Sequence, residues 1–165
     1  MNEGTRAPKQ LGDFGEGLVT YTLIRKGYEV AYVDHVGADL IAEKNGKRYA
    51  ISVKTRTFRS GTRENHMVVI AQDNLTKLQY FADRFALIPF FAQVACIADT
   101  QTIHVFMMLN GRIPSVLRKV QHGYSLSFGR RSLPALVQLP DVDYSCWQQE
   151  RIGAYDFDQS PSPVS

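Results

Sequence analysis

Hydrophobic and polar positions recur with two different periods in the first half of the chain. Over residues 11–26 the apolar side chains return every three to four positions, which is typical of an amphipathic helix, and Gly27 follows as a helix stop. Over residues 48–56 they alternate with period two, which is typical of a strand with one buried face. Residues 1–10 show neither period, and we predict a mobile arm there.

The same patterns predict the remaining elements. Strands are expected over residues 28–33, 38–42, 67–71, 90–98 and 102–109, and helices over residues 74–86 and 112–120. Asp73 is a candidate helix cap. Beyond residue 121 the patterns weaken, and residues 156–165 have the composition of a disordered tail. This order of elements predicts one α/β domain over residues 1–155, with a central mixed β-sheet flanked by helices.

The strongest local signal is a hairpin at Asn45-Gly46, a dipeptide that favours the tight turn between two antiparallel strands. The second strand carries Lys54 on the same face as Ser52. A lysine is costly to bury alone, so we expect a partner on the neighbouring strand, and Asp39 is placed to provide it. One interpretation is a structural ion pair between Asp39 and Lys54. The other is a site that uses both charges.

The stretch from the first helix to this strand resembles the PD-(D/E)xK nuclease superfamily, the fold of many restriction enzymes and archaeal Holliday junction resolvases. In that superfamily an aspartate begins the second strand, an acid-x-lysine triplet lies on the third, and a glutamate on the preceding helix often joins them. Asp39 matches the aspartate and Glu16 matches the helix glutamate. Ser52-Val53-Lys54 takes the place of the triplet, with Ser52 where the acid is expected. The resemblance implies a restriction endonuclease-like core.

The resemblance also implies a metal-dependent DNA endonuclease that hydrolyses phosphodiester bonds, with branched or foreign DNA as substrate. Its catalytic residues would be Glu16, Asp39, Ser52 and Lys54. Mg²⁺, or Mn²⁺ in its place, would bind the carboxylates of Asp39 and Glu16 and the backbone carbonyl of Val53, because a hard cation prefers oxygen ligands. Lys54 would hold the attacking water and offset the charge of the phosphate.

Ser52 separates this interpretation from an alternative. A neutral hydroxyl attracts a divalent cation less than a carboxylate does, so metal affinity is expected to fall. The alternative is a nuclease-fold protein that has lost catalysis and binds nucleic acid or a protein partner. The sequence leaves the oligomeric state open, and a homodimer is one of the options.

Basic residues are concentrated around the hairpin. Between residues 44 and 63 the chain has seven basic side chains and no acidic one. Because lysine and arginine hold DNA through its phosphates, the candidate DNA-binding residues are Lys44, Lys47, Arg48, Arg56, Arg59 and Arg63. The alternative is a solvated hairpin edge whose charges prevent aggregation. Arg130-Arg131 forms a second, shorter basic spot.

Composition narrows the picture only slightly. A hydrophobic content of 44% and a charged content of 21% are ordinary for a globular protein, and a formal charge of +3 says little about partners. No apolar run reaches the roughly 18 residues that span a bilayer, and the first ten residues lack a signal-peptide core. The two cysteines form no CxxC pair, and the histidines lack zinc-ligand spacing. These observations predict a cytoplasmic protein without membrane contact.

Overall fold

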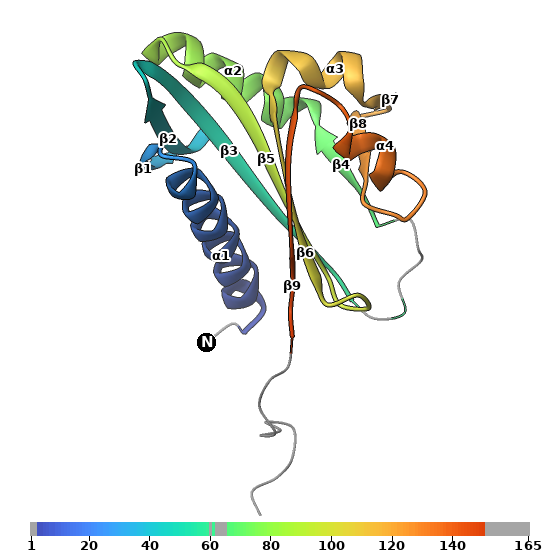
Figure 1. Ribbon diagram of the computed structural model, residues 1–165. Coiled ribbons are helices and arrows are strands. Elements are labelled where there is room, and N and C mark those ends of the chain that lie inside the picture. The colour runs from blue at the N-terminus through green and yellow to red at the C-terminus, as the bar shows by residue number, and fades with distance from the viewer. Residues whose placement is uncertain (1–2, 60, 62–65, 151–165) are drawn as a thin grey trace, which may run out of the picture.

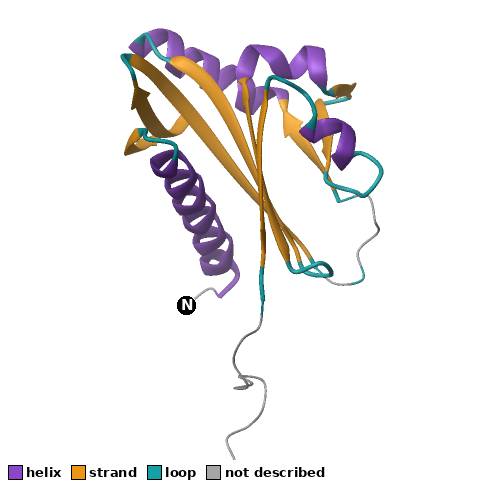
Figure 2. Ribbon diagram, viewed as in Figure 1, coloured by secondary structure: helices purple, strands orange, loops and turns teal. Residues whose placement is uncertain are grey.

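The computed structural model describes residues 3–59, 61 and 66–150 and confirms the predicted α/β architecture. The central sheet has six strands, which lie side by side in the order β1 (Glu29–His35), β2 (Ala38–Lys44), β3 (Lys47–Phe58), β5 (Ile88–Ile97), β6 (Thr102–Leu109) and β9 (Val142–Gln148) (Figure 1). A smaller sheet has the order β4 (Met67–Ala71), β8 (Gly123–Ser127) and β7 (Arg118–Val120). The helices are α1 (Glu3–Arg25), α2 (Gln72–Phe85), α3 (Ile113–Val116) and α4 (Leu133–Val137), with a 3-10 turn, η1 (Asn110–Arg112) (Figure 2).

The central sheet is mixed, as predicted. β1, β2 and β3 form an antiparallel meander, and β3 then pairs in parallel with β5 from Tyr49↔Ile88 to Phe58↔Ile97. Parallel neighbours need a crossover connection, and β4 and α2 provide it. β5, β6 and β9 complete the sheet in antiparallel pairing.

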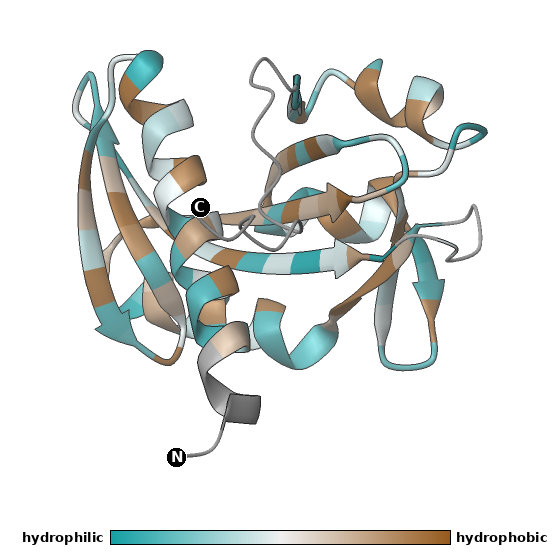
Figure 3. Cartoon of the chain, turned by 90° about the horizontal axis from the view of Figure 1, so that it is seen from below, coloured by the Kyte–Doolittle hydropathy of each residue, from teal (hydrophilic) through white to brown (hydrophobic). Residues whose placement is uncertain are grey.

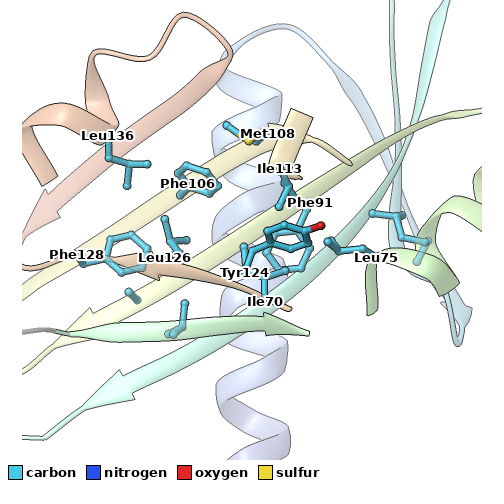
Figure 4. Packing of buried hydrophobic residues seen from close by; sticks show 14 of the residues in the cluster. Ile70, Leu75, Phe91, Phe106, Met108, Ile113, Tyr124, Leu126, Phe128 and Leu136 are labelled. Carbon is cyan, nitrogen blue, oxygen red and sulfur yellow. The ribbon is translucent and has the colours of Figure 1, made fainter. Parts of the chain in front are cut away.

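Each face of the central sheet has its own hydrophobic core. On one face, α1 packs through Val19 and Leu23 against Ile51 and Val53 of β3. On the other face, α2 and the small sheet enclose a larger core; its members include Ile70, Leu75, Phe91, Phe106, Met108, Ile113, Tyr124, Leu126, Phe128 and Leu136 (Figure 4). Figure 3 shows apolar and polar residues mixed along α1, the helix nearest the N label, as expected for a helix with one buried side. The period-two pattern predicted for β3 is therefore confirmed, because Ala50 belongs to the second core and Ile51 to the first.

β3 extends well beyond its partner β2. The last pair between the two strands is Leu40↔Ile51, and β2 begins at Ala38. β3 continues to Phe58 with β5 alone on its other side. One edge of β3 is consequently open from Ser52 onwards, and this edge locates the candidate site.

Two local predictions near the helix starts are wrong. The arm predicted over residues 1–10 is helical from Glu3 onwards, although α1 contains Pro8. The apolar period begins only at residue 11. A helix anchored by its packed part can nevertheless extend towards the N-terminus by one backbone hydrogen bond per residue, and Lys9 supports it through an ion pair with Asp13 at 3.0 Å. Asp73 caps nothing: α2 starts after Ala71 without a side-chain cap, and Asp73 instead pairs with Lys77 at 2.6 Å.

The second half of the chain is more structured than its pattern indicates. The helix predicted over residues 112–120 is only one turn of α3 followed by β7. Residues 121–150 supply β8, α4 and β9, the last of which completes the central sheet. The predicted tail over residues 156–165 lies outside the described residues. Among the residues that the structure describes, no helix combines the length and apolar character needed to cross a membrane.

Candidate active site

Asp39 occupies the open edge of β3. Its Oδ2 accepts a hydrogen bond from the backbone N–H of Val53 at 2.6 Å, in place of the strand partner that β2 no longer provides. The N–H and C=O groups of one strand residue point to the same neighbouring strand, so the Val53 carbonyl faces this edge as well. The Asp39 carboxylate and the Val53 carbonyl thus share this edge of the strand.

Lys54 does not form the structural ion pair with Asp39 that was one interpretation of the sequence. Asp39 and Lys54 are both described, and no ion pair joins them; the Asp39 carboxylate bonds to the backbone instead. Lys54 is half-buried and lines a cleft of about 440 Å³ together with Arg56, Gln93 and residues of β4. Its backbone carbonyl accepts a hydrogen bond from Gln93 Nε2 at 3.0 Å. The interpretation of Asp39 and Lys54 as a structural ion pair is therefore wrong, and Lys54 instead contributes its charge to the cleft.

Glu16 reaches the same region from α1. Burial raises the pKa of its carboxyl group, and the negative charges of Asp39 and Asp13 raise it further. Lys54 acts in the opposite direction. Glu16 is thus within electrostatic range of both Asp39 and Lys54, and the structure brings together three charged residues that are far apart in sequence.

A close contact between α1 and β3 sets the position of Glu16. A Cβ atom added at Gly15 would lie 1.9 Å from Thr55 Oγ1 and 3.1 Å from Thr55 Cβ, so only glycine allows this approach. By contrast, a Cβ atom at Gly12 or Gly17 would meet nothing within 4 Å. Gly15 therefore acts as a positioning residue for the carboxylate that follows it.

Ser52 lies on the same face of β3 as Lys54 and is only 4% exposed. Within the described part of the chain, no three His, Cys, Asp or Glu side chains come together as a metal site. A carboxylate at position 52 would be the missing third member. The donors that remain are the carboxylates of Asp39 and Glu16 and the Val53 carbonyl, and this all-oxygen set fits a hard divalent cation.

The predicted DNA-binding residues fall into two separate groups. Lys44, Lys47 and Arg48 lie at the hairpin end of β3, and the Lys44 ammonium bonds to the Lys26 carbonyl and lies 5.3 Å from the centre of the Tyr28 ring. At about 3.3 Å per residue, Lys47 is roughly 23 Å from Lys54 along the strand. The seven-base stretch is therefore not one patch.

The second group lies at the other end of β3. Arg56 lines the cleft with Lys54, and Arg59 follows the end of the strand. Arg63 lies outside the described residues. Gln93 and Asn74 also line this cleft and were not predicted from the sequence. Gln93 is 4% exposed and is the one amide side chain in the apolar strand β5. Because a polar group is costly to bury without a partner, this isolated amide could have indicated a functional position.

Comparison with solved structures places the fold. The chain is similar to Hjc, a Holliday junction resolvase from the archaeal hyperthermophile Archaeoglobus fulgidus, with a TM-score of 0.50 and 14% identity over 75% of this chain and 95% of that chain. A bacterial homing endonuclease matches with a TM-score of 0.45 and 16% identity over 74% of this chain and 75% of that chain. No family model and no curated protein matches the sequence. The chain therefore shares the restriction endonuclease-like fold of this resolvase, which confirms the fold predicted from its sequence.

The raised pKa of Glu16 gives a test of the site geometry. Of the two neighbouring aspartates, Asp39 raises the pKa of Glu16 more than Asp13 does. The pKa of Glu16 should therefore fall in Asp39→Asn and should fall less in Asp13→Asn. NMR titration of the Glu16 carboxyl carbon in the three proteins measures both changes. In the native protein a divalent cation should bind more weakly as the pH falls through this raised pKa, since protons then compete for the carboxylate. An unchanged Glu16 pKa in Asp39→Asn would show that the two carboxylates do not share a site.

Proposed function

We propose that the protein is a metal-dependent DNA endonuclease whose active site is the open edge of β3. The observation that carries this proposal is the hydrogen bond from Val53 to the Asp39 carboxylate, which positions a carboxylate and a backbone carbonyl beside Lys54 and Glu16. The proposal includes a divalent cation, Mg²⁺ or Mn²⁺, and DNA as substrate. The restriction endonuclease-like fold supports it.

Each residue of the site has a separate task. Asp39, Glu16 and the Val53 carbonyl would hold the cation, which when bound neutralises phosphate charge and lowers the pKa of a water ligand. Lys54 orients the attacking water through its ammonium donors and stabilises the negative charge that develops on the phosphate. Ser52 contributes a hydroxyl where a third carboxylate would bind the cation more tightly.

The cleft beside Lys54 suits the phosphate backbone of the cleaved strand. Lys54 and Arg56 provide positive charge, Asn74 and Gln93 provide amide donors, and no carboxylate lines the cleft among the described residues. Lys47 and Arg48 would contact DNA farther away, because roughly 23 Å along β3 corresponds to about seven base-pair steps. These side chains should therefore affect binding more than the chemical step.

Nicking of supercoiled plasmid tests the proposal directly. The purified protein should convert it to the open-circular form with Mg²⁺ or Mn²⁺ and should be inactive in EDTA. A four-way junction and a linear duplex of the same sequence then distinguish branched from ordinary DNA as the preferred substrate. DNA binding without cleavage in either metal, at any concentration tested, would favour the alternative of a binding protein that has lost catalysis, for which the missing acid at Ser52 is the supporting observation.

Ser52→Asp is expected to increase metal dependence. Position 52 is buried, so an added carboxylate without a cation is poorly solvated and should lower the melting temperature in EDTA. A cation bound between Asp39 and the new carboxylate should reverse this loss and bind more tightly than in the native protein. Thermal melting with and without Mn²⁺, together with calorimetric titration, measures both effects, and Ser52→Ala is the control for loss of the hydroxyl. Equal metal affinity in native and Asp variants would mean that position 52 does not face the cation.

A further inference from the structure

A second hollow, of about 310 Å³, lies on the same face of the central sheet as the cleft beside Lys54. Its lining residues come from three separate parts of the chain and are His66, Ile97, Asp99, Thr100, Thr102, His104, Phe128, Arg130 and Leu133. Consecutive residues connect the two spaces: Met67 lines the cleft and His66 lines the hollow. The endonuclease site proposed above uses none of the residues that line the hollow.

The floor of the hollow is apolar and largely aromatic. Ile97, His104 and Phe128 are each buried, and the rings of His104 and Phe128 lie 5.7 Å apart at an interplanar angle of 41°. Burial lowers the pKa of His104, and the nearby His66 lowers it further. His104 is therefore neutral at physiological pH, and the floor carries no net charge.

Hydrogen bonds hold the floor and part of the rim in place. His104 Nδ1 bonds to the Tyr144 hydroxyl of β9 at 2.7 Å, and its Nε2 bonds to Thr102 Oγ1 at 2.9 Å. Thr102 Oγ1 in turn lies 2.5 Å from Thr100 Oγ1. Asp99 Oδ1 accepts a hydrogen bond from the Gly61 N–H at 3.3 Å. Because these contacts fix the side chains before anything binds, the hollow is preorganised.

We propose that this hollow binds a nucleobase. A volume of about 310 Å³ is at the lower end of small-molecule sites and suits a flat heteroaromatic ring. The floor offers rings and aliphatic carbon for stacking, as sites for extruded bases do, and Asp99, Thr100 and Thr102 offer hydrogen-bonding groups at the rim. Arg130 is exposed at the same rim and is placed for the attached phosphate. The hollow thus combines an apolar floor, a polar rim and one cation.

The position of the hollow indicates how far from the cleaved phosphate the bound nucleotide would lie along the DNA. Ile97 pairs with Phe58, four residues beyond Lys54 on β3, a separation of about 13 Å. This distance corresponds to about four base steps of a duplex from the phosphate beside Lys54. This inference depends on the proposed function in one respect, because it takes the base to be part of a DNA substrate. It predicts that DNA with an unpaired base near the cleavage position is preferred.

A matched pair of DNA duplexes tests the inference without cleavage. One duplex carries a single unpaired adenosine at its centre, and the other has an abasic site at that position, so that the phosphates are the same. Fluorescence anisotropy in EDTA should show about fivefold or tighter binding of the adenosine duplex to the native protein, in keeping with the value of stacking one base. Thr100→Trp places a large ring at the exposed rim and should abolish this preference. Thr76→Trp, at an exposed position on α2 away from the hollow, should keep it.

Two further results separate the possible outcomes. In the first, deoxyadenosine monophosphate is added to the native protein. If it shifts the NMR methyl signals of Leu133 and Thr102 and competes with the adenosine duplex, a free nucleotide is a second source of the same base. Equal binding of the adenosine and abasic duplexes by the native protein would overturn the inference. Plasmid nicking distinguishes this failure from failure of the proposed function, because nicking can persist without a base preference and a base preference can persist without nicking.

Discussion

Asp39→Asn should reduce DNA cleavage by at least about 10²-fold, because it removes the carboxylate that would bind the cation and leaves the developing phosphate charge without compensation. The asparagine side-chain oxygen can still accept the hydrogen bond from Val53 N–H, so the open edge of β3 should keep its structure. Lys54→Ala should have a loss of similar size through the missing ammonium. Initial rates of plasmid nicking, with circular dichroism to verify folding, measure both losses.

The control for Asp39→Asn is Asp34→Asn, which removes one negative charge from an exposed position on β1. It should leave the nicking rate within about twofold of native, as expected for a surface substitution away from the site. DNA affinity should be retained or increased in Asp39→Asn, since a negative charge near the phosphate is lost. Cleavage at the native rate by Asp39→Asn or Lys54→Ala would refute the roles assigned to these residues.

Gly15→Ala should damage both the fold and the candidate site. The added methyl group would overlap Thr55 Oγ1, so α1 must move away from β3, and overpacking of this kind typically costs about 1–3 kcal/mol. Glu16 is the next residue and moves with the helix, so Mn²⁺ affinity and nicking should fall together. Urea unfolding and calorimetric titration of Mn²⁺ provide the two measurements.

Gly17→Ala is the matched control, because a Cβ atom there meets nothing within 4 Å. It should raise the free energy of unfolding by about 0.5–1 kcal/mol, the usual gain from replacing a helical glycine by alanine, and leave nicking unchanged. The double variant Gly15→Ala/Thr55→Ala removes the oxygen involved in the closest contact and should recover part of the loss. Equal stabilisation by Gly15→Ala and Gly17→Ala would show that the contact with Thr55 does not position α1.

The sequence determined the elements with strong internal patterns. The turn at Asn45-Gly46, the alternation along β3 and the apolar runs of β5 and β6 are each set by contacts over short distances, and the structure confirms all of them. The fold class followed from the order of these elements. Asp39, Val53 and Lys54 could be placed together because the hairpin fixes the register between their strands.

Tertiary structure decided the features that depend on distant parts of the chain. β9 carries a mixed, half-exposed sequence, and it becomes a strand because the edge of β6 offers hydrogen-bonding partners. Lys47 and Lys54 belong to one basic stretch in sequence, but a strand separates its residues by about 3.3 Å each, so the basic side chains divide into two groups.

The candidate active site and the second hollow also combine features that the sequence determined with features that only the tertiary structure decided. The sequence placed Glu16 on a helix, but the packing of α1 on β3, with its close approach at Gly15 and Thr55, brings the Glu16 carboxylate towards Asp39 and Lys54. The hollow is assembled from the residue before β4, the β5–β6 hairpin and the segment after β8, and no local pattern indicates that they meet. Short-range patterns depend on neighbours in sequence, whereas both sites depend on which residues the folded sheets and helices bring together in space.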